Sequence, residues 1–359
     1  MLPEAAGPLA SRLAAGEQLL ADPPAALVRR VDDLDRDGRG LVYAGSYTAV
    51  RSFCGRRVLG YRLESHFAAE RKDVQYRLLG VETSDRQLLR IENHTDVRHA
   101  ITEQVAHGPA VIQGVPRGLL AIGASHTYLL PADASRSRIS QMLDRITEDC
   151  ADLILAPLNT GLPCTYYGFL TSDHVVDFGP FEALVYWDRR SWRLYAPGVI
   201  RPVQLGDQEA ASRSAVRAAA RRLQQRIDYA GAFGTDGVVS ANPYSVHEIN
   251  PRVCAGFAVL DHICDDTIPL AAVDLVVRER RPPAGHPLMV RLDQLATALR
   301  RIQTPVIRLL DDRHRSIQEK LSTSAVRTSD PAAWLRLARL CLASKSFVSI
   351  TQFAPAGDH

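Results

Sequence analysis

Two carboxylates and an amide stand at strand-like spacing in the second half of the chain. Asp236 lies in one short apolar run, and the next run contains Glu248-Ile249-Asn250-Pro251-Arg252. Side chains two residues apart in a strand point to the same face, so Glu248 and Asn250 project together. A turn near residues 241–243 would bring Asp236 alongside them on the neighbouring strand.

This set of side chains is typical of a magnesium site. Mg²⁺ prefers carboxylate and amide oxygens and shares them with substrate phosphates, whereas two adjacent carboxylates without a cation repel each other. Taken one at a time, Asp236 could cap a turn and Glu248 could face water. That alternative does not account for the occurrence of these residues together in one motif. We therefore predict Asp236, Glu248 and Asn250 as metal ligands. Arg252 is predicted to be catalytic, because it can stabilise charge on a phosphate or an acyl phosphate.

The elements around these residues indicate a mixed α+β or α/β protein. Strands are expected over 234–239 and 244–249, after an amphipathic helix from Gln208 to Ile227 with arginines on its polar face. Earlier in the chain we expect strands at 40–45, 57–61, 111–112 and 153–155, and short strands across 164–200. Helices are expected over 70–79 and 135–146, and the chain after Asp265 is predicted to be mostly helical.

Composition sets limits on the class of protein. The chain has 359 residues, a net charge of +3 and 23% charged residues, so no nucleic-acid or membrane partner is expected. No run of about 18 apolar residues occurs, and the six cysteines show no metal-binding spacing. We expect free thiols and a cytoplasmic protein. Three lysines occur, and one of them, Lys72, precedes residue 300.

The motif of Asp236, Glu248 and Asn250 resembles the magnesium ligands of the ATP-grasp superfamily. A longer stretch, from about Gly161 to Leu260, resembles the pheganomycin-type peptide ligases of that superfamily. The residues that carry this second resemblance are Gly161-Leu162-Pro163-Cys164, Gly168, Gly179-Pro180-Phe181-Glu182, Tyr195-Ala196 and Tyr229-Ala230-Gly231-Ala232-Phe233.

The resemblance implies an ATP-grasp fold, in which two α+β lobes hold ATP with Mg²⁺. It divides the chain into a reduced N-terminal αβ unit (1–70), a small lobe with a glycine-rich loop (71–160), a metal and nucleotide lobe (161–266) and a mostly helical C-terminal region (267–359). It also implies a ligase that phosphorylates an acid to an acyl phosphate, which an amine then attacks.

Several cofactor-binding residues follow from the resemblance alone. Lys72 occupies the place of a phosphate-binding lysine and is predicted to be catalytic as well. Gln113 stands where a second lysine is usual. Its presence indicates either weaker ATP binding, with an arginine such as Arg117 compensating, or unusual chemistry. Gly118 belongs to the loop that would cover the phosphates.

The remaining expectations concern adenine, ribose and packing. The backbone of Leu155 and Ala156 is expected to contact adenine, and Glu182 is expected to position the ribose or a substrate amine, with a surface role as the alternative. Cys254 replaces a family glycine and is expected to pack rather than react. His66, His126 and His262 could each act as an acid–base group, but each is expected to be a structural or surface histidine.

The predicted function is an ATP-dependent ligase that forms an amide or peptide bond, with a role in natural-product and antibiotic biosynthesis. Its partners would be a small-molecule acid and an amine or peptide acceptor. Two alternatives stay open: a protein that binds nucleotide without turnover, which Gln113 favours, and an ATP-grasp kinase. The sequence names neither the substrates nor the oligomeric state, so a homodimer also stays open.

Overall fold

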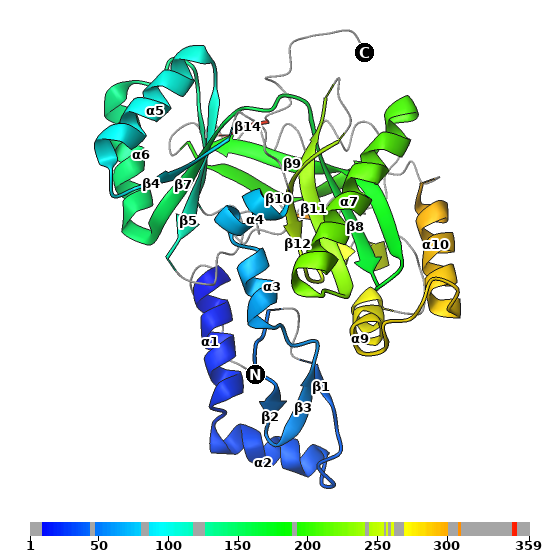
Figure 1. Cartoon of the computed structure of the whole chain (residues 1–359). Helices are drawn as coiled ribbons and strands as arrows, with labels where there is room; N and C mark the ends of the chain where they lie inside the picture. The colour runs from blue at the N-terminus through cyan, green and yellow to red at the C-terminus, as the bar shows by residue number, and fades with distance from the viewer. Residues whose placement is uncertain are drawn as a thin grey trace.

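The computed structural model describes residues 9–43, 47–79, 86–117, 126–188, 192–240, 244–254, 256–257, 260–261, 269–300, 308–309 and 347–349. These residues form three parts, each built around its own sheet, and two short helices lie where the parts meet (Figure 1). The mixed α+β class predicted from the sequence is confirmed.

The N-terminal part is a small three-stranded sheet with two helices. Its elements are α1 (Leu9–Ala21), α2 (Ala25–Leu34), β1 (Val42–Tyr43), β2 (Ser52–Phe53) and β3 (Arg56–Leu59), and the strand order is β1-β3-β2. Arg56 ties the sheet to α2 through ion pairs with Asp32 and Asp35, at 2.8 and 2.7 Å. Of the strand expected over 40–45, Val42–Tyr43 is a strand, and Tyr43 is 45% exposed, so it is less buried than predicted. Residues 44–46 lie outside the described residues.

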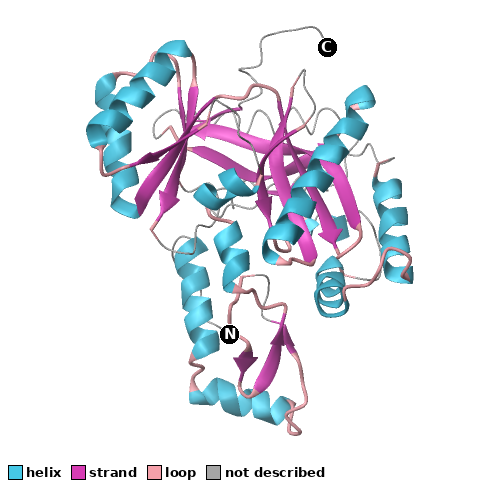
Figure 2. Ribbon diagram, viewed as in Figure 1, coloured by secondary structure: helices cyan, strands magenta, loops and turns pink. Residues whose placement is uncertain are grey.

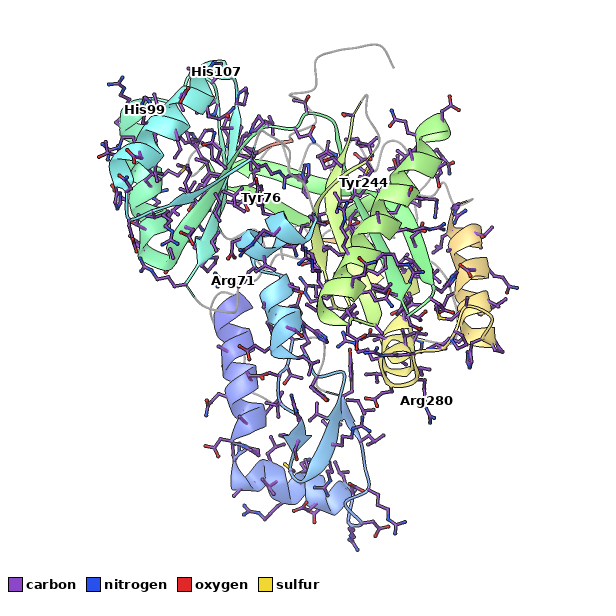
Figure 3. All side chains as sticks on the ribbon, viewed as in Figure 1. Arg71, Tyr76, His99, His107, Tyr244 and Arg280 are labelled. Carbon is purple, nitrogen blue, oxygen red and sulfur yellow. The ribbon has the colours of Figure 1, made fainter. Side chains whose placement is uncertain are left out.

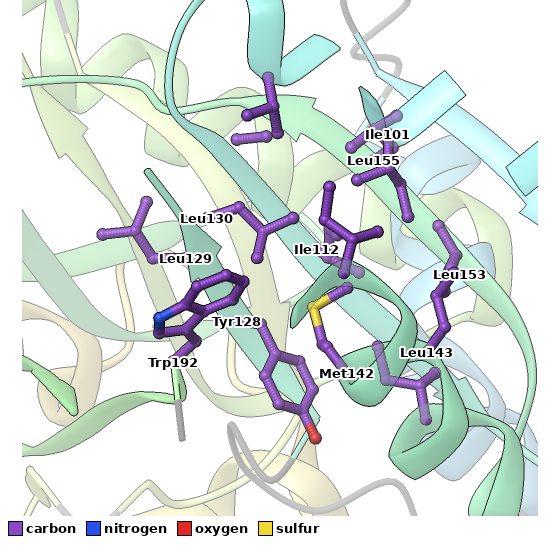
Figure 4. Close-up of a cluster of buried hydrophobic side chains, with 14 of the residues drawn as sticks. Ile101, Ile112, Tyr128, Leu129, Leu130, Met142, Leu143, Leu153, Leu155 and Trp192 are labelled. Atoms are coloured by element: carbon purple, nitrogen blue, oxygen red, sulfur yellow. The ribbon is translucent and has the colours of Figure 1, made fainter. Parts of the chain in front are cut away.

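The small lobe is a four-stranded antiparallel sheet with strand order β4-β7-β5-β6. Its strands are β4 (Gln87–Arg90), β5 (Ala110–Pro116), β6 (Thr127–Leu130) and β7 (Cys150–Pro157), and its helices are α5 (His94–His107) and α6 (Arg136–Asp149). Both helices pack on one face, where they share an apolar core with alternate residues of the strands, such as Ile112 and Leu155 (Figure 4). The other face is left for contacts with the rest of the molecule.

The large lobe is a seven-stranded sheet with helices on both faces (Figure 2). Its main strands run in the order β12-β11-β8-β9-β10-β13, and β14 pairs with β9. The bounds are β8 (Leu162–Leu170), β9 (Val175–Asp188), β10 (Leu194–Pro202), β11 (Gly231–Val239), β12 (Ser245–Asn250), β13 (Arg308–Leu309) and β14 (Phe347–Ser349), with a 3₁₀ turn η1 (Gly206–Gln208).

Alternation along β8 divides the two cores of the large lobe. Tyr166 packs with the apolar face of α7 (Glu209–Ile227), which includes Val216 and Leu223. Tyr167 points to the opposite face, where α9 (Leu270–Arg280) and α10 (Pro287–Leu299) pack. This division decides which sheet residues can belong to one site.

Two short helices, α3 (Glu64–Ala69) and α4 (Lys72–Leu78), connect the N-terminal part to the small lobe and lie beside the large lobe (Figure 1). The single helix predicted over 70–79 is therefore wrong at its start. The chain breaks at Arg71, which has extended backbone angles and forms the N-cap of α4. The break starts a fresh helical turn at Lys72.

The C-terminal region is partly different from the prediction. Helices α9 and α10 occur, but they pack on the large-lobe sheet, and β13 and β14 add strands to that sheet. The division of the chain at residues 70, 160 and 266 remains a prediction. In the described part of the chain, no helix has both the length and the apolar character needed to cross a membrane, and Cys54, Cys150, Cys164 and Cys254 are free thiols.

Candidate active site

The hairpin of β11 and β12 brings the predicted carboxylates together. The register pairs Asp236 with Glu248 and Gly234 with Asn250, so both acids and the amide point to the same face of the sheet. A bulge follows directly, between Asp236 and Gly237, where the pairing shifts by one residue. The strand pairing predicted from the sequence is therefore confirmed.

Lys72 and Arg252 join this group from outside the hairpin. The Lys72 ammonium, at the first turn of α4, forms an ion pair and a hydrogen bond with the Glu248 carboxylate. Asn250 donates its amide N–H to Asp236 at 3.4 Å and accepts a hydrogen bond from Arg252 at the same distance. Five predicted residues, separated by up to 180 positions in the sequence, thus form one connected polar cluster.

The two carboxylates have opposite ionisation tendencies. Burial raises the pKa of Asp236 and repulsion from Glu248 adds to the effect, which gives a value of about 6. Burial opposes the ionisation of Glu248 as well, but the ammonium of Lys72 outweighs it and lowers the pKa of that carboxyl. The Asp236 side chain is partly exposed to solvent. The protein atoms around its carboxyl group nevertheless displace enough water to disfavour the ionised form.

Arg252 is held by a second acid that no sequence motif pointed to. Glu70, at the C-cap of α3, accepts hydrogen bonds from Arg252 at 2.9 Å and pairs with Arg62 at 2.9 Å. All three side chains are at most 10% exposed. The ring of Tyr47, from the N-terminal part, lies 4.8 Å from the guanidinium carbon of Arg252. The N-terminal part therefore contributes directly to the surroundings of Arg252.

Gln75 joins α4 to β12, the strand at the edge of the large-lobe sheet. Its amide oxygen accepts from the Ile249 N–H at 2.8 Å, and its amide nitrogen donates to the Ile249 carbonyl. The side chain thus satisfies both backbone groups of Ile249 in the way that a neighbouring strand would. Because Ile249 lies between Glu248 and Asn250, this contact positions both predicted ligands.

The donor set fits a hard divalent cation with one adjustment. Asp236 and Glu248 offer carboxylate oxygens, and a cation between them would offset the burial and the repulsion from Glu248 that together raise the pKa of Asp236. Asn250 turns its oxygen toward Arg252, so a cation would require the amide to rotate. The described residues contain no cluster of three or more His, Cys, Asp and Glu side chains that could hold a metal, so a cation here would use the amide and external oxygens as well.

Comparison with known proteins identifies the fold. No family model matches the sequence, and no curated protein matches it. The structure of carboxyaminoimidazole ribonucleotide synthase from Aspergillus clavatus, complexed with ATP, is similar with a TM-score of 0.50 and 11% identity, over 83% of this chain and 78% of that one. The chain has an ATP-grasp fold.

Two ligases are similar at lower TM-scores. D-alanine-D-alanine ligase from Helicobacter pylori gives a TM-score of 0.42 at 14% identity, over 64% of each chain. L-amino acid ligase from Bacillus licheniformis gives 0.45 at 12% identity, over 72% of this chain and 60% of that one. The chain therefore spans less than two thirds of the length of these two enzymes. Likeness at this level of identity describes the fold and not the substrates.

In the ATP-grasp fold the small-lobe residues occupy a different sheet from the carboxylates. Gln113 lies on β5, between Thr127 of β6 and Ile154 of β7, on the face away from α5 and α6. Arg117 donates to the carbonyls of Thr147 and Glu148 at the end of α6, and its expected compensation for Gln113 remains a prediction. Arg117 thus caps a helix, and Gly118 lies outside the described residues.

The residues expected to contact adenine are at the end of β7. Leu155 lies between Gln87 of β4 and Ile112 of β5, with its side chain in the core. Ala156 pairs with Val111 on β5 and lies beyond the last pair that β7 makes with β4. Ala156 is therefore better placed than Leu155 to offer its backbone to a ligand, and both roles remain predictions.

The structure does not bring Glu182 into the polar cluster. Glu182 is buried on β9 opposite Cys164, whose side chain belongs to the core under α7. Asp236 points to the other face of the same sheet, since it pairs with Thr165. A role for Glu182 with ribose or an amine remains a prediction that would need a ligand on the far side of the sheet.

The remaining predicted residues are placed as follows. Cys254 packs closely against β11, because a Cβ atom added to Gly234 would lie 2.6 Å from the Cys254 sulfur. Burial raises the pKa of the Cys254 thiol to about 12. Burial, with help from Arg278 and Arg62, lowers the pKa of His66 to about 3. His126 lies 3.9 Å from Asp149, and His262 is outside the described residues.

Sequence reasoning missed Glu70, Gln75, Arg62 and Tyr47. None of them belongs to the motif, and each acts on it from 174 to 205 residues away in the chain. The available signal was Glu70, an acid next to Arg71-Lys72 at an expected helix. Burial of that acid, which gives it its role, follows only from the packing of α3 against the large lobe.

Proposed function

We propose that this chain is an ATP-dependent ligase that joins a carboxylate to an amine through an acyl phosphate. The observation that carries the proposal is the cross-strand pair Asp236–Glu248 in a chain that has the ATP-grasp fold. Lys72 contacts Glu248 in this pair, and Arg252 is linked to Asp236 through Asn250. The similar structure from Aspergillus clavatus is a complex with ATP, which supports ATP as the nucleotide.

The proposed reaction has two steps. A carboxylate oxygen of the acid attacks the γ-phosphorus of ATP, the bond to the bridging oxygen breaks, and ADP leaves. The amine nitrogen then attacks the acyl carbon, the carbon–oxygen bond to phosphate breaks, phosphate leaves, and the nitrogen loses a proton. Mg²⁺, when bound, would neutralise charge on the transferred phosphoryl group.

The chain's own residues would bind and orient the reactants. Asp236, Glu248 and Asn250 would hold the cation, and α4 would keep β12 in place through Gln75. Arg252 stays charged between Glu70 and Asn250, and it can donate to the oxygens of the phosphate or of the acid. Lys72 would have to move from Glu248 in order to reach a phosphate.

We further propose that the acid is an amino acid or a related acid, that the acceptor is an amine or a peptide, and that the product belongs to natural-product biosynthesis. The resemblance of segment 161–260 to the pheganomycin-type peptide ligases supports this assignment.

The test is a turnover assay with Mg·ATP and a panel of amino acids and peptides. Acceptor-dependent release of ADP and phosphate, with a product of the mass of acid plus amine minus water, is the expected result. ADP formation with a phosphorylated product that no amine consumes would indicate a kinase. Calorimetric binding of ATP without turnover on any pair would favour the second candidate, a nucleotide-binding protein without ligase activity, for which Gln113 is the observation in favour.

A further inference from the structure

Helix α2 lies at the far end of the N-terminal part, away from both lobes (Figure 1). Two ion pairs fix the rotation of this helix about its axis, because Asp32 and Asp35 both bind Arg56 of β3, at 2.8 and 2.7 Å. Val28 precedes Asp32 by four residues and therefore lies on the same side of the helix. Val28, Asp32 and Asp35 thus define the side of α2 that faces the small sheet.

An apolar stripe runs along α2 beside the face that meets the sheet. Leu27, Val31 and Leu34 stand at positions i, i+4 and i+7, which lie on one side of a helix. Leu27 and Val31 are half-buried, whereas Leu34 is 81% exposed, and none of the ten residues of α2 is buried. Side chains of the N-terminal part project away from the lobes at this end of the molecule (Figure 3). The stripe is therefore an apolar helix face that the sheet covers only in part.

The N-terminal part has a small core of its own. In residues 14–59, the buried apolar side chains that the structure describes are Phe53 and Val58. A unit of this size gains little free energy from so few buried side chains, and small units usually depend on further contacts for their stability. Covering the stripe of α2 would therefore add apolar burial where the N-terminal part has little.

The charges beside the stripe favour a second copy of α2 as the covering element. Arg30 and Asp33 are both exposed, and their helical positions place them on the side of the stripe away from the sheet. Asp33 lies in the last turn of α2, where the dipole of its own helix disfavours an acid. An arginine from a neighbouring helix would offset that cost, and an antiparallel copy of α2 carries one at the matching level.

One antiparallel register satisfies both the charges and the apolar side chains. When a two-fold axis passes between positions 31 and 32, Arg30 of each copy lies level with Asp33 of the other. The same register places Leu34 of one copy between the levels of Leu27 and Val31 of the other, so the two apolar stripes interleave.

We propose that the chain forms a homodimer in which α2 packs antiparallel on α2 of a second copy. Leu27, Val31 and Leu34 form the apolar seam, and Arg30 and Asp33 form ion pairs at its rim. Two helices of ten residues bury less area than a standard interface of about 1,600 Å², so the dimer should dissociate in the micromolar range. This contact is independent of the proposed reaction, since α2 lies apart from the pair Asp236–Glu248 (Figure 1).

The test is sedimentation of the whole chain over a series of concentrations across the micromolar range. Leu34→Gln should raise the dissociation constant of the dimer by about tenfold or more, because each dimer loses two buried leucine contacts. Leu88→Gln is the matched control: it removes a leucine of β4 in the small lobe that is 43% exposed, and it should keep the wild-type dissociation constant. A wild-type chain that stays monomeric throughout would overturn the proposal and leave the stripe to a different protein. A dimer that Leu34→Gln leaves intact would also overturn it.

Reversing the rim charges tests the register. Arg30 and Asp33 are exposed, so Arg30→Glu and Asp33→Arg should both keep the fold, which circular dichroism checks. Each substitution alone sets like charges against each other twice per dimer and should raise the dissociation constant by about threefold or more. An equimolar mixture of the two variants should regain the wild-type value, because every changed side chain then meets an opposite charge. Weakening without recovery in the mixture, or no weakening at all, would contradict the antiparallel pairing.

Discussion

At the scale of single residues, most charged side chains of the candidate active site form ion pairs with one another. Lys72 neutralises Glu248, and Glu70 is shared by Arg62 and Arg252. The pKa of Asp236 is raised, because burial and the charge of Glu248 both disfavour its ionised form. A divalent cation would reverse that preference, so Asp236 is the residue on which metal binding should have the largest effect.

Glu248→Gln should abolish most of the turnover and leave the fold intact. The substitution keeps the shape of the side chain, but removes the charge that would hold the cation and that pairs with Lys72. The expected loss in the rate of ADP release is about 10²-fold or more. Glu279→Gln, a surface acid paired with Arg57, is the control and should keep wild-type activity. Full activity in Glu248→Gln would contradict the metal assignment.

Glu70→Gln should destabilise the protein as well as slow the reaction. Arg62 and Arg252 would then share a neutral amide while both stay buried, and breaking such a pair costs about 3–5 kcal/mol. Urea unfolding measures the free energy of unfolding, and steady-state kinetics measures kcat. A change in stability below about 1 kcal/mol would show that water reaches these arginines and that Glu70 is not what holds them.

At the scale of elements, α4 carries more of the site than its seven residues suggest. It contacts β12 through Lys72 and Gln75, and it contacts the start of β4 through Tyr76. A helix this short has little stability of its own, so these contacts and not its intrinsic propensity hold it in place. Helix α4 therefore joins the two lobes, and its own stability depends on its contacts with both of them.

Gln75→Leu tests this role of α4. Leucine fills a similar volume but leaves the N–H and the carbonyl of Ile249 without partners, which should cost about 2–4 kcal/mol in the free energy of unfolding. Hydrogen exchange at the Ile249 amide should speed up accordingly. Arg77→Gln, on the exposed side of the same helix, should change stability by less than about 0.5 kcal/mol.

The pH dependence of stability should reveal His66 on α3. Its pKa falls from 6.5 in the unfolded chain to about 3 in the folded one, so the unfolded state binds more protons between these values. The stability contribution is complete above pH 6.5 and is lost as the pH falls toward 3, by up to about 4 kcal/mol. The difference in unfolding free energy between wild type and His66→Gln, measured from pH 7 to pH 4, should shrink as the pH falls. A difference independent of pH would contradict the buried neutral imidazole.

Predictability from the sequence also differs between elements. The hairpin of β11 and β12 was predictable, because Asp236 and Glu248 lie in adjacent strands and local alternation decides their direction. The break before Lys72 was not, because helix propensity continues through Glu70 and Arg71, and the break comes from tertiary contacts. Glu182 lies in a segment that resembles the ligases. The face of the sheet to which its side chain points, however, depends on the register of β9 with β8, which no local sequence pattern specifies.

At the scale of the whole molecule, the β9–β10 pair joins the two lobes. Trp187, near the end of β9, and Leu194, at the start of β10, pack into the small-lobe core together with Trp192, although the rest of both strands belongs to the large lobe. The Trp192 carbonyl accepts from the Leu129 N–H at 2.9 Å. The small lobe is therefore anchored by residues that belong to the other sheet.

Trp192→Ala should affect both stability and nucleotide binding. The indole is 6% exposed, and Arg138 lies over it at 5.4 Å, so its removal leaves a cavity in the small-lobe core that costs about 3–5 kcal/mol. Because the same residue connects the lobes, the Kd for Mg·ATP should rise even at temperatures where the variant is folded. Thermal unfolding and calorimetry check the two effects, and Trp192→Phe should lose much less of each. A variant that is destabilised but binds ATP as tightly as wild type would show that the lobes keep their relative positions through α4 alone.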